Sequence, residues 1–522
     1  MEALDWLVIG VFFLALIGII VWVVRQKQND SADYFLGGRD ATWLAIGASI
    51  FASNIGSEHL IGLAGAGASS GMAMAHWEIQ GWMILILGWV FVPFYTRSMV
   101  YTMPEFLERR YNPQSRTILS VISLVSYVLT KVAVTVYAGG LVFQQVFGIK
   151  ELWGIDFFWI AAIGLVVLTA LYTIFGGMKS VLYTSVLQTP ILLLGSLIIL
   201  VLGFKELGGW DEMMRVCGAV TVNDYGDTMT NLIRSNDDAN FPWLGALIGS
   251  AIIGFWYWCT DQFIVQRVLS GKNEMEARRG TIFGAYLKLL PVFLFLIPGM
   301  IAFALHQKYI GAGGEGFLPM LENGTANADA AFPTLVAKLL PAGVKGLVVC
   351  GILAALMSSL ASLFNSSAML FTIDFYKRFR PQTSEKKLVG IGQVATVVIV
   401  ILGILWIPIM RSVGDVLYTY LQDVQSVLAP GIAAAFLLGI CWKRTSAQGG
   451  MWGLISGMVI GLTRLGAKVY YSNAGEVADS TFKYLFYDMN WLFFCGWMFL
   501  FCIIVVIVVS LATEAPTAEK IQ

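Results

Sequence analysis

The sequence predicts an all-α protein that crosses a membrane many times. Hydrophobic residues make up 57% of its 522 residues and charged residues only 13%, whereas a soluble domain usually carries about 25% charged residues. A chain this long and this apolar cannot cover its surface in one water-soluble core. It also divides into about thirteen apolar stretches, two of which are interrupted by polar residues. We therefore expect a multi-pass protein of the cell (inner or plasma) membrane, surrounded by the lipid bilayer.

The charge balance and the cysteines argue against several other classes of protein. The 33 basic and 33 acidic residues cancel, so no positive excess points to a nucleic-acid partner. The six cysteines form no CxxC pair, and burial as small hydrophobic side chains explains them better than metal binding or disulfides. The chain has no HExxH, no GxSxG with a plausible triad and no phosphate-binding loop. We expect neither an enzyme nor an organic cofactor.

The thirteen candidate spans follow from the length of an apolar run. A spanning helix needs about 20 mostly apolar residues. In chain order, the candidates cover residues 5–24, 43–71, 77–100, 117–147, 157–175, 181–204, 243–266, 279–305, 335–376, 388–409, 416–440, 450–470 and 490–512. The first is preceded by Glu2 and Asp5 rather than by basic residues, so we interpret it as a retained helix and not a signal peptide. The ninth is too long for one crossing and is expected to extend past the bilayer.

The loops predict the orientation and the organisation of the chain. Most of the 33 Lys and Arg residues fall in short loops on one side if the N-terminus is outside, and short basic loops favour the cytoplasm. We therefore expect the N-terminus outside and the C-terminus inside. The expected parts are an N-terminal helix and loop (1–42), a first repeat (43–204), an extracellular loop (205–242), a second repeat (243–445, with an extracellular loop at 306–334) and two C-terminal helices with a tail (446–522).

Polar residues interrupt the second and the seventh span. The second contains the Ser/Asn/Gly/Glu/His cluster of residues 49–59, and the seventh contains the sequence WYWCTDQ at residues 256–262. Irregular backbone at membrane depth is tolerated only where protein or a water-filled cavity surrounds it. The two interruptions lie five spans apart. This spacing suggests two inverted five-helix repeats, spans 2–6 and 7–11, each of which begins with a discontinuous helix.

Several ionisable residues lie within or near the ends of the expected spans, and such residues are costly in lipid and usually functional. They are Glu58, Glu78, Lys131, Asp261, Lys288, Asp423 and Arg464. For any one of them, a structural ion pair or a side chain that reaches the interface is an equally good explanation. Seven together, beside two interrupted helices, favour a polar cavity.

Three small residues in the ninth span are candidates for a sodium site. Ala355, Ser358 and Ser359 have the i, i+3, i+4 spacing of one helical face. Small residues with this spacing often only permit close helix packing, and from these residues alone that is the simpler interpretation. The functional interpretation is that the two hydroxyls, together with carbonyls freed at a helix break, form a neutral oxygen cage that holds Na⁺ weakly enough to release it.

A second group of residues has the chemistry of a carbohydrate site. Gln422 carries an amide that both donates and accepts hydrogen bonds, as a sugar hydroxyl does. Tyr257, Trp258 and Tyr420 offer aromatic faces for the C–H groups of a hexose ring. For each aromatic residue taken singly, packing against lipid or at the membrane interface remains the more common explanation.

Longer motifs make the chain resemble the solute:sodium symporter family, and within it the sodium/glucose cotransporters. The matching stretches run in order along nearly the whole chain, at residues 33–39, 47–57, 103–107, 171–177, 256–267, 286–289, 357–360 and 436–444. The resemblance implies a LeuT-type fold with a ten-helix 5+5 inverted-repeat core, preceded by one helix and followed by two. It also implies alternating access, in which extracellular sodium binds first and sugar follows.

The same motifs imply the residues of the two sites. The sodium site falls on the backbone of Ala52 and Ile55, the carbonyl of Ala355 and the hydroxyls of Ser358 and Ser359. The sugar pocket falls on Asn54, His59, Glu78, Lys288, Gln422 and the backbone around Tyr257, with Trp258 beside it. Tyr257 matches the aromatic residue that closes the inner side of the pocket, and Tyr418 matches one near the outer gate.

The chain also departs from the family pattern in ways that bear on stoichiometry and substrate. Ser185 stands where many relatives have Asp, which removes a carboxylate from a possible second sodium site or exit step and favours one sodium per sugar. Gln425 stands where the animal glucose carriers have Thr, and Asp423 adds a charge beside Gln422. We expect import of glucose or galactose. The alternatives are a sodium symporter for myo-inositol or another polyol or organic solute, and a sugar-gated sensor or conductance on the same fold.

Overall fold

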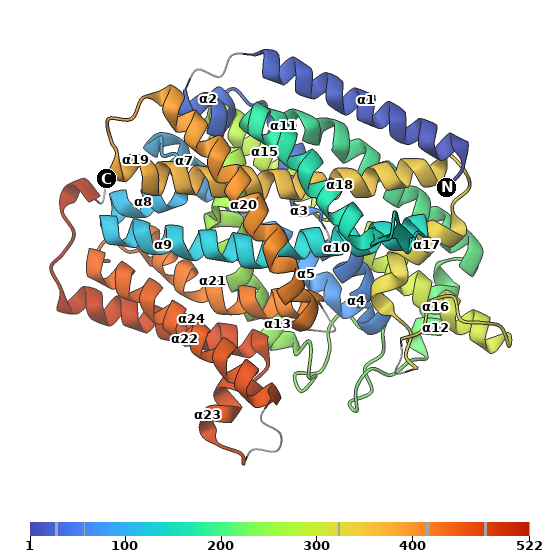
Figure 1. The fold of residues 1–522 in the computed structure, drawn as a ribbon. Helices are drawn as coiled ribbons and strands as arrows, with labels where there is room; N and C mark the ends of the chain where they lie inside the picture. The colour runs from blue at the N-terminus through green and yellow to red at the C-terminus, as the bar shows by residue number, and fades with distance from the viewer. Residues whose placement is uncertain (27–29, 57, 322–323, 414–416, 474–477, 521–522) are drawn as a thin grey trace.

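The computed structural model describes residues 1–26, 30–56, 58–321, 324–413, 417–473 and 478–520, and its helices form one bundle (Figure 1). Within these ranges, the side chains of residues 129–130, 409–413, 417–423 and 473 are not described. Most helices lie along a common direction. The two ends of the chain lie at opposite ends of the bundle, as an odd number of crossings requires.

The N-terminal half is helical apart from one short hairpin. It contains α1 (Ala3–Arg25), α2 (Ser31–Leu36), η1 (Gly37–Arg39), α3 (Trp43–Asn54), η2 (Glu58–Leu63), α4 (Ala64–Ser70), η3 (Gly71–Met74), α5 (Ala75–Ile79), η4 (Gln80–Trp82), α6 (Met83–Ile86), η5 (Leu87–Phe91), α7 (Val92–Ser98), α8 (Met103–Arg110), α9 (Pro113–Ser126), η6 (Tyr127–Val132), α10 (Ala133–Phe147), the antiparallel strands β1 (Glu151–Leu152) and β2 (Ile155–Asp156), α11 (Phe157–Leu207) and α12 (Trp210–Gly218). Here η marks short 3₁₀ or π-helical turns.

The C-terminal half continues in the same way. It contains α13 (Trp243–Gly254), η7 (Phe255–Thr260), α14 (Gln262–Leu269), α15 (Glu274–Leu287), η8 (Val292–Leu296), α16 (Ile297–Gly311), η9 (Ala328–Ala330), α17 (Ala331–Leu339), α18 (Val344–Met369), η10 (Leu370–Tyr376), α19 (Lys377–Phe379), α20 (Glu385–Val413), α21 (Leu417–Cys441), α22 (Ala447–Asn473), α23 (Thr481–Lys483), η11 (Tyr484–Asp488), α24 (Trp491–Ala512) and η12 (Ala518–Lys520).

All thirteen expected spans fall on helical segments. Among the described residues, nine segments are long and apolar enough to cross a membrane by themselves, and Trp43–Asn54 and Ala133–Phe147 are shorter apolar helices within other expected spans. The fifth and sixth spans are the two helical parts of α11, which are divided at Gly177, where φ is 52° and ψ is −147°. The ninth span is longer than one crossing needs, since residues 344–379 form one segment of 36 residues. Its predicted start at residue 335 was wrong, because Gly343, with φ at 81°, separates α17 from α18.

The N-terminal helix is fixed to the helix that runs through the middle of the bundle. α18 crosses the centre, and α1 lies along its outer side (Figure 1). The Asp5 carboxylate accepts hydrogen bonds from the backbone N–H groups of Gly343 (2.7 Å) and Gly346 (2.8 Å). A carboxylate at this position satisfies the free donors of a helix N-terminus and complements its positive dipole end. Asp5 thus fixes the start of α18, which carries the serines of the candidate sodium site.

Candidate functional site

The first break in the helical backbone occurs where the sequence predicts it. α3 ends at Asn54, and Ile55 has an extended backbone with φ at −78° and ψ at 98°. The π-helical turn η2 then starts at Glu58. Because the helix stops at membrane depth, carbonyl groups at the end of α3 lose their partners within the helix. Such carbonyls are the groups that coordinate a coupling ion in transporters with discontinuous helices.

The hydroxyl of Ser359 on α18 meets this broken end. Its Oγ donates to the Ser53 carbonyl oxygen at 2.7 Å and lies 3.4 Å from the Ile55 carbonyl oxygen. A Cβ at Gly56 would lie 2.9 Å from the same Oγ, so a glycine here permits the close approach. Ala52 and Ala355 are buried beside them, each about 1% exposed. These atoms form a small group of neutral oxygens.

Ser358, the residue before Ser359, lies next to α11. Its Oγ lies 3.2 Å from Ser185 Oγ on α11, and Ser185 Oγ lies 3.5 Å from Ser49 Oγ. Ser185 therefore extends the cluster of serine hydroxyls without adding charge.

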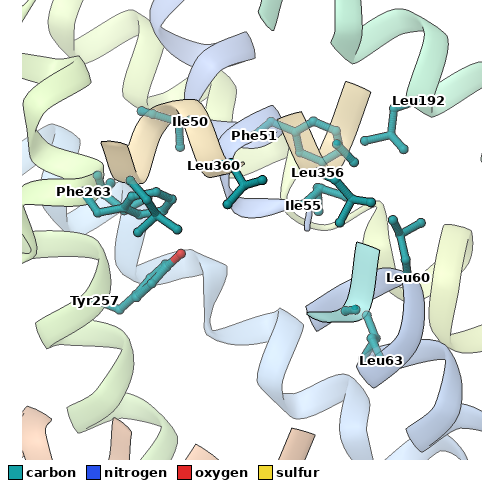
Figure 2. Close-up of a cluster of buried hydrophobic side chains, with 14 of the residues drawn as sticks. Ile50, Phe51, Ile55, Leu60, Leu63, Leu192, Tyr257, Phe263, Leu356 and Leu360 are labelled. Atoms are coloured by element: carbon teal, nitrogen blue, oxygen red, sulfur yellow. The ribbon is translucent and has the colours of Figure 1, made fainter. Parts of the chain in front are cut away.

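Apolar side chains surround the break and separate it from lipid. Ile50, Phe51 and Ile55 of α3 pack with Leu356 and Leu360 of α18 (Figure 2). All five are at most 1% exposed. A cation held here would lie in a low-dielectric environment, where ion–dipole interactions with the carbonyls are stronger than in water.

A buried cationic side chain lies next to the same break, and the sequence did not suggest it. Arg267 of α14 is 1% exposed, and its Nε donates to Ser53 Oγ at 3.1 Å. Neither of its two terminal nitrogens has a hydrogen-bond partner among the described residues. Its guanidinium lies 4.9 Å from the Phe263 ring centroid. A fixed positive charge close to a sodium site opposes tight binding of the ion.

The second break gives the pocket its aromatic side. The π-helical turn η7 ends at Thr260, and Asp261, with ψ at 127°, caps the start of α14. Tyr257 and Trp258 lie in this turn with their rings edge to face, 4.9 Å between centroids. The Tyr257 hydroxyl accepts a hydrogen bond from Asn54 Nδ2 at 3.0 Å, and in Figure 2 it points towards the space below Leu360. The two breaks therefore meet through one side-chain contact.

A polar pocket of about 30 Å³ lies between these elements. Its lining consists of Asn54, Glu58, His59, Trp77, Glu78, Gln80, Ile253, Tyr257, Trp258, Lys288 and Gln425. That volume is close to the share of one water molecule in the liquid, about 30 Å³. A ring-shaped solute with six heavy ring atoms requires the pocket to widen.

Three buried ionisable side chains pack together in the pocket. Lys288 Nζ lies 2.6 Å from Glu78 Oε2 and 2.8 Å from His59 Nε2, and His59 Nε2 lies 3.3 Å from Glu78 Oε1. The side chains of Glu78 and Lys288 are 1% and 5% exposed. Because the lysine ammonium can only donate, His59 Nε2 accepts from it and the proton of the neutral imidazole is on Nδ1. The carboxylate of Glu78 and the ammonium of Lys288 therefore balance each other's charge beside the neutral imidazole.

Three other buried polar atoms of the pocket have no hydrogen-bond partner among the described residues. They are Asn54 Oδ1, Gln80 Oε1 and His59 Nδ1. Native proteins leave few buried polar atoms unpaired, and those that remain require an explanation. Two acceptors and one N–H donor in one small pocket match the mixed donor and acceptor character of hydroxyl groups. The amide of Gln80 fits there because Gly254 has no side chain, since a Cβ at Gly254 would lie 2.5 Å from Gln80 Oε1.

An ion pair lies on the other side of Tyr257. Lys131 Nζ is 2.7 Å from Asp261 Oδ2 and 4.6 Å from the Tyr257 ring centroid. Tyr127 donates its hydroxyl proton to Asp261 Oδ1. Asp261 is therefore held by direct contacts with Lys131 and Tyr127. These buried residues lie next to Tyr257, which is predicted to be the inner gate.

The structure brings together six of the seven residues predicted for the sugar pocket, which are Asn54, His59, Glu78, Tyr257, Trp258 and Lys288. The seventh, Gln422, and the predicted outer gate, Tyr418, have side chains outside the described residues. Sequence reasoning missed Trp77, Gln80 and Ile253 in the lining. Trp77 directly precedes Glu78 in the sequence, and Gln80 follows it by two positions. An aromatic, an acidic and an amide residue so close together in an apolar span were the available signal. Ile253 gave none.

Comparison with known proteins decides the family. The model of the sodium:solute symporter family matches residues 34–457. The chain belongs to this family. It is a sodium-coupled solute symporter, a multi-pass membrane protein and not an enzyme.

Individual relatives agree along the full length of this symporter. It is 37% identical over 536 residues to the sodium/myo-inositol cotransporter 2 of Homo sapiens, covering 100% of this chain and 78% of that protein. It is 36% identical over 537 residues to the sodium/glucose cotransporter 4 of Danio rerio, covering 100% and 80%. A solved Na⁺-coupled sialic acid symporter is similar in structure, with a TM-score of 0.79 at 22% sequence identity over 99% of both chains. The symporter has the LeuT-type fold that the family resemblance implied.

Proposed function

We propose that this symporter imports a cyclic polyol together with sodium, and that myo-inositol is the first substrate to test. Two observations support the choice. In the described part of the chain, Asn54 Oδ1, Gln80 Oε1 and His59 Nδ1 of the pocket have no partner, and they lie beside an ion-paired Glu78 and Lys288. The human relative with 37% identity over the whole chain is a sodium/myo-inositol cotransporter. The relatives thus favour the alternative of our sequence analysis over glucose or galactose.

The chemistry of the pocket suits a ring whose carbons all carry hydroxyl groups. Each hydroxyl donates one hydrogen bond and accepts others, so it can pair with a carboxylate, an ammonium or an amide without leaving any buried group unsatisfied. The C–H face of the ring can rest on the indole of Trp258. A solute of this kind would replace direct contacts within the Glu78–His59–Lys288 group by contacts through its hydroxyls.

A hexose is the second candidate. The sodium/glucose cotransporter 4 of Danio rerio is 36% identical to this symporter over the whole chain. Glucose and galactose present the same kind of hydroxyl groups, but they add a ring oxygen and a hydroxymethyl group. Gln425, which lines the pocket, is a side chain that can distinguish the two kinds of ring.

We propose that the coupling ion binds at Ala52, Ile55, Ala355, Ser358 and Ser359. The support is the 2.7 Å contact between Ser359 Oγ and the carbonyl of Ser53 at the end of α3. A sodium ion there would bridge α3 and α18 and so favour one relative position of the two helices. Residues 43–204 and 243–445 would form the two inverted repeats that move relative to each other. One sodium per solute is the simplest stoichiometry, because Ser185 brings no carboxylate.

The proposed cycle uses the two breaks as one unit. Sodium from outside would hold the end of α3 in place, and the polyol would then occupy the widened pocket beside it. Closure would place the solute between Trp258 and the ion-paired group. Opening on the cytoplasmic side would require Tyr257 to move from Asn54, with which it shares a 3.0 Å hydrogen bond. In the proposed orientation of the symporter in the membrane, the N-terminus lies outside and the C-terminus inside.

Tracer uptake into proteoliposomes tests the proposal. We expect myo-inositol to accumulate when an inward sodium gradient is imposed, and glucose and galactose to accumulate more slowly. Potassium in place of sodium should reduce uptake to that of empty liposomes. Equal uptake in the two salts would refute sodium coupling of this solute, and sodium-driven uptake of glucose alone would move the assignment to the hexose. A solute-evoked current without accumulation would identify a conductance.

A further inference from the structure

A long apolar groove runs along the outside of the bundle between α9 and α20. Its volume is about 820 Å³. The lining residues are Leu124, Val125, Val128, Phe371, Tyr376, Ile391, Val394, Ala395, Val398, Ile399, Leu402, Leu405 and Trp406. In Figure 1, α20 crosses over the line of α9 and α10. From Ile391 to Trp406 the groove follows about 22 Å of helix, at 1.5 Å per residue.

One end of the groove is bordered by a strongly basic loop. The eleven residues 377–387 join η10 to α20, and they contain five basic residues and one acidic residue. The basic residues are Lys377, Arg378, Arg380, Lys386 and Lys387. Apart from Lys377 they are all exposed. The single acid, Glu385, is engaged by Lys377 at 3.4 Å and by the Ser31 hydroxyl at 2.6 Å, so it does not neutralise the others.

We propose that this groove and loop together form a binding site for an anionic phospholipid. The phosphate would contact the exposed Arg380, Lys386 and Lys387, and an acyl chain would lie in the groove. Clusters of Lys and Arg directly beside a transmembrane helix attract anionic head groups. One leaflet contributes about 15 Å of the roughly 30 Å hydrocarbon core, so a chain that enters from the basic end fits within the groove. The charge at one end and the apolar lining beyond it match the two parts of one lipid molecule.

The site lies on the helix that carries the candidate sodium ligands. η10 continues α18 without a break, and together they cover residues 344–376. Asp374 of η10 accepts from Arg116 Nε at 2.7 Å and from Thr102 Oγ1 at 2.8 Å, which joins this end of the helix to α8 and α9. A lipid in the groove would contact both η10 and α9. It would therefore favour one packing of the α18–η10 helix against α9.

Native mass spectrometry of the purified full-length protein, titrated with phosphatidylglycerol or phosphatidylcholine, tests the proposal without a transport assay. Wild type should bind phosphatidylglycerol more tightly. The double variant Lys386→Gln/Lys387→Gln should weaken phosphatidylglycerol binding on the order of thirtyfold, since each basic residue near a head group contributes roughly fivefold, and should leave phosphatidylcholine unchanged. Lys272→Gln/Arg279→Gln, which removes two exposed charges, one before α15 and one in its first turns, is the matched control and should bind as wild type.

A second variant tests the groove separately from the charge. Ala395 is 6% exposed and lines the groove, so Ala395→Trp should fill it and weaken binding of both lipids. Equal affinity of wild type for the two lipids would overturn the proposal. So would a control pair that weakens phosphatidylglycerol binding as much as the Lys386 and Lys387 pair, because the effect would then be one of net charge.

Discussion

Ser359 carries one hydroxyl group that can act in two ways. It donates to the Ser53 carbonyl at 2.7 Å, and rotation of the same hydroxyl turns its lone pairs to the space beside Ile55, whose carbonyl is 3.4 Å away. A hydroxyl has one proton and two acceptor sites, so it can satisfy the broken helix end and also contribute an oxygen to a cation. The serine therefore gives the helix break a stable partner in both situations.

We expect Ser359→Ala to weaken sodium binding by about tenfold to a hundredfold. The change removes one oxygen and leaves the Ser53 carbonyl without its partner, a loss of roughly 1–3 kcal/mol. The measurement is the sodium concentration that gives half-maximal uptake, or half-maximal change of tryptophan fluorescence. Ser366→Ala is the control, since Ser366 lies on the same helix and donates to Gln266 instead. A sodium dependence shifted equally by both variants would exclude a specific role for Ser359.

Glu78 and Lys288 show how a buried charge depends on its partner. Their side chains are nearly inaccessible and lie 2.6 Å apart. Glu78→Gln would leave the ammonium without its counter-charge, and the loss of one partner of a buried pair costs about 3–5 kcal/mol. We expect a clearly lower thermal transition in detergent and loss of solute binding.

The double variant Glu78→Gln/Lys288→Met separates stability from function in this pair. Removal of both charges should restore most of the thermal stability, because no unpaired charge remains, while solute binding stays lost. Glu212→Gln, which breaks an exposed pair with Arg215, should change neither quantity, because surface pairs contribute only about 0–1 kcal/mol. A double variant as unstable as the single one would show that the ion pair does not explain the loss.

At the scale of elements, α4 and α16 pack with their backbones in contact. A Cβ on Gly299 would collide with the Ala64 carbonyl oxygen, and one on Gly67 would collide with that of Leu296. Small residues at helix interfaces in membranes permit this close approach. The contact supports the second half of the broken span, because α4 continues directly from η2, the turn that contains His59.

We therefore expect Gly299→Ala to destabilise the protein by about 1–3 kcal/mol, the usual cost of an added methyl group in a packed core. Gly164→Ala is the control, since nothing lies within 4 Å of a Cβ at that position of α11. It should be neutral or slightly stabilising, because alanine favours the helix. Thermal stability in detergent is the measurement, and equal effects of the two substitutions would contradict the assigned contact.

Helix breaks were easier to predict than helix ends. Residues 49–59 and 256–262 put polar groups where a lipid-facing helix would place apolar ones, and both breaks are present. The separation of α17 from α18 depends on Gly343 at positive φ, and the apolar sequence on both sides hid it. The division of α11 agrees with the sequence, since the non-helical Gly177 lies between the fifth expected span, which ends at residue 175, and the sixth, which begins at residue 181.

At the scale of the whole molecule, the two candidate sites lie side by side. Asn54, which lines the pocket, is adjacent in the chain to Ser53 and Ile55, whose carbonyls meet Ser359. A structural change at one site is therefore transmitted to the other through one or two residues. Binding free energies that are coupled in this way are reciprocal.

We expect sodium to raise the affinity for the polyol, and the polyol to raise the affinity for sodium by the same factor, about 5- to 150-fold for a typical coupling. Trp77 and Trp258 line the pocket, so tryptophan fluorescence can follow both titrations. The measurement is a matrix of sodium and myo-inositol concentrations, with choline replacing sodium as control. Affinity for the polyol that is independent of sodium would contradict coupling through the break.

The sequence by itself determined the membrane class, the positions of the spans and the two breaks, because a scarcity of charge and polar runs within apolar stretches are local properties. Motifs also pointed to most of the pocket, including Asn54, His59, Glu78 and Lys288. Only the tertiary structure decided that Gln80 reaches the pocket through the space left by Gly254, and that Ser358 contacts Ser185 of α11. It alone placed Arg267 beside Ser53. These contacts join helices far apart in the chain, and the distances between such helices are set by packing, of which a single sequence holds no local record.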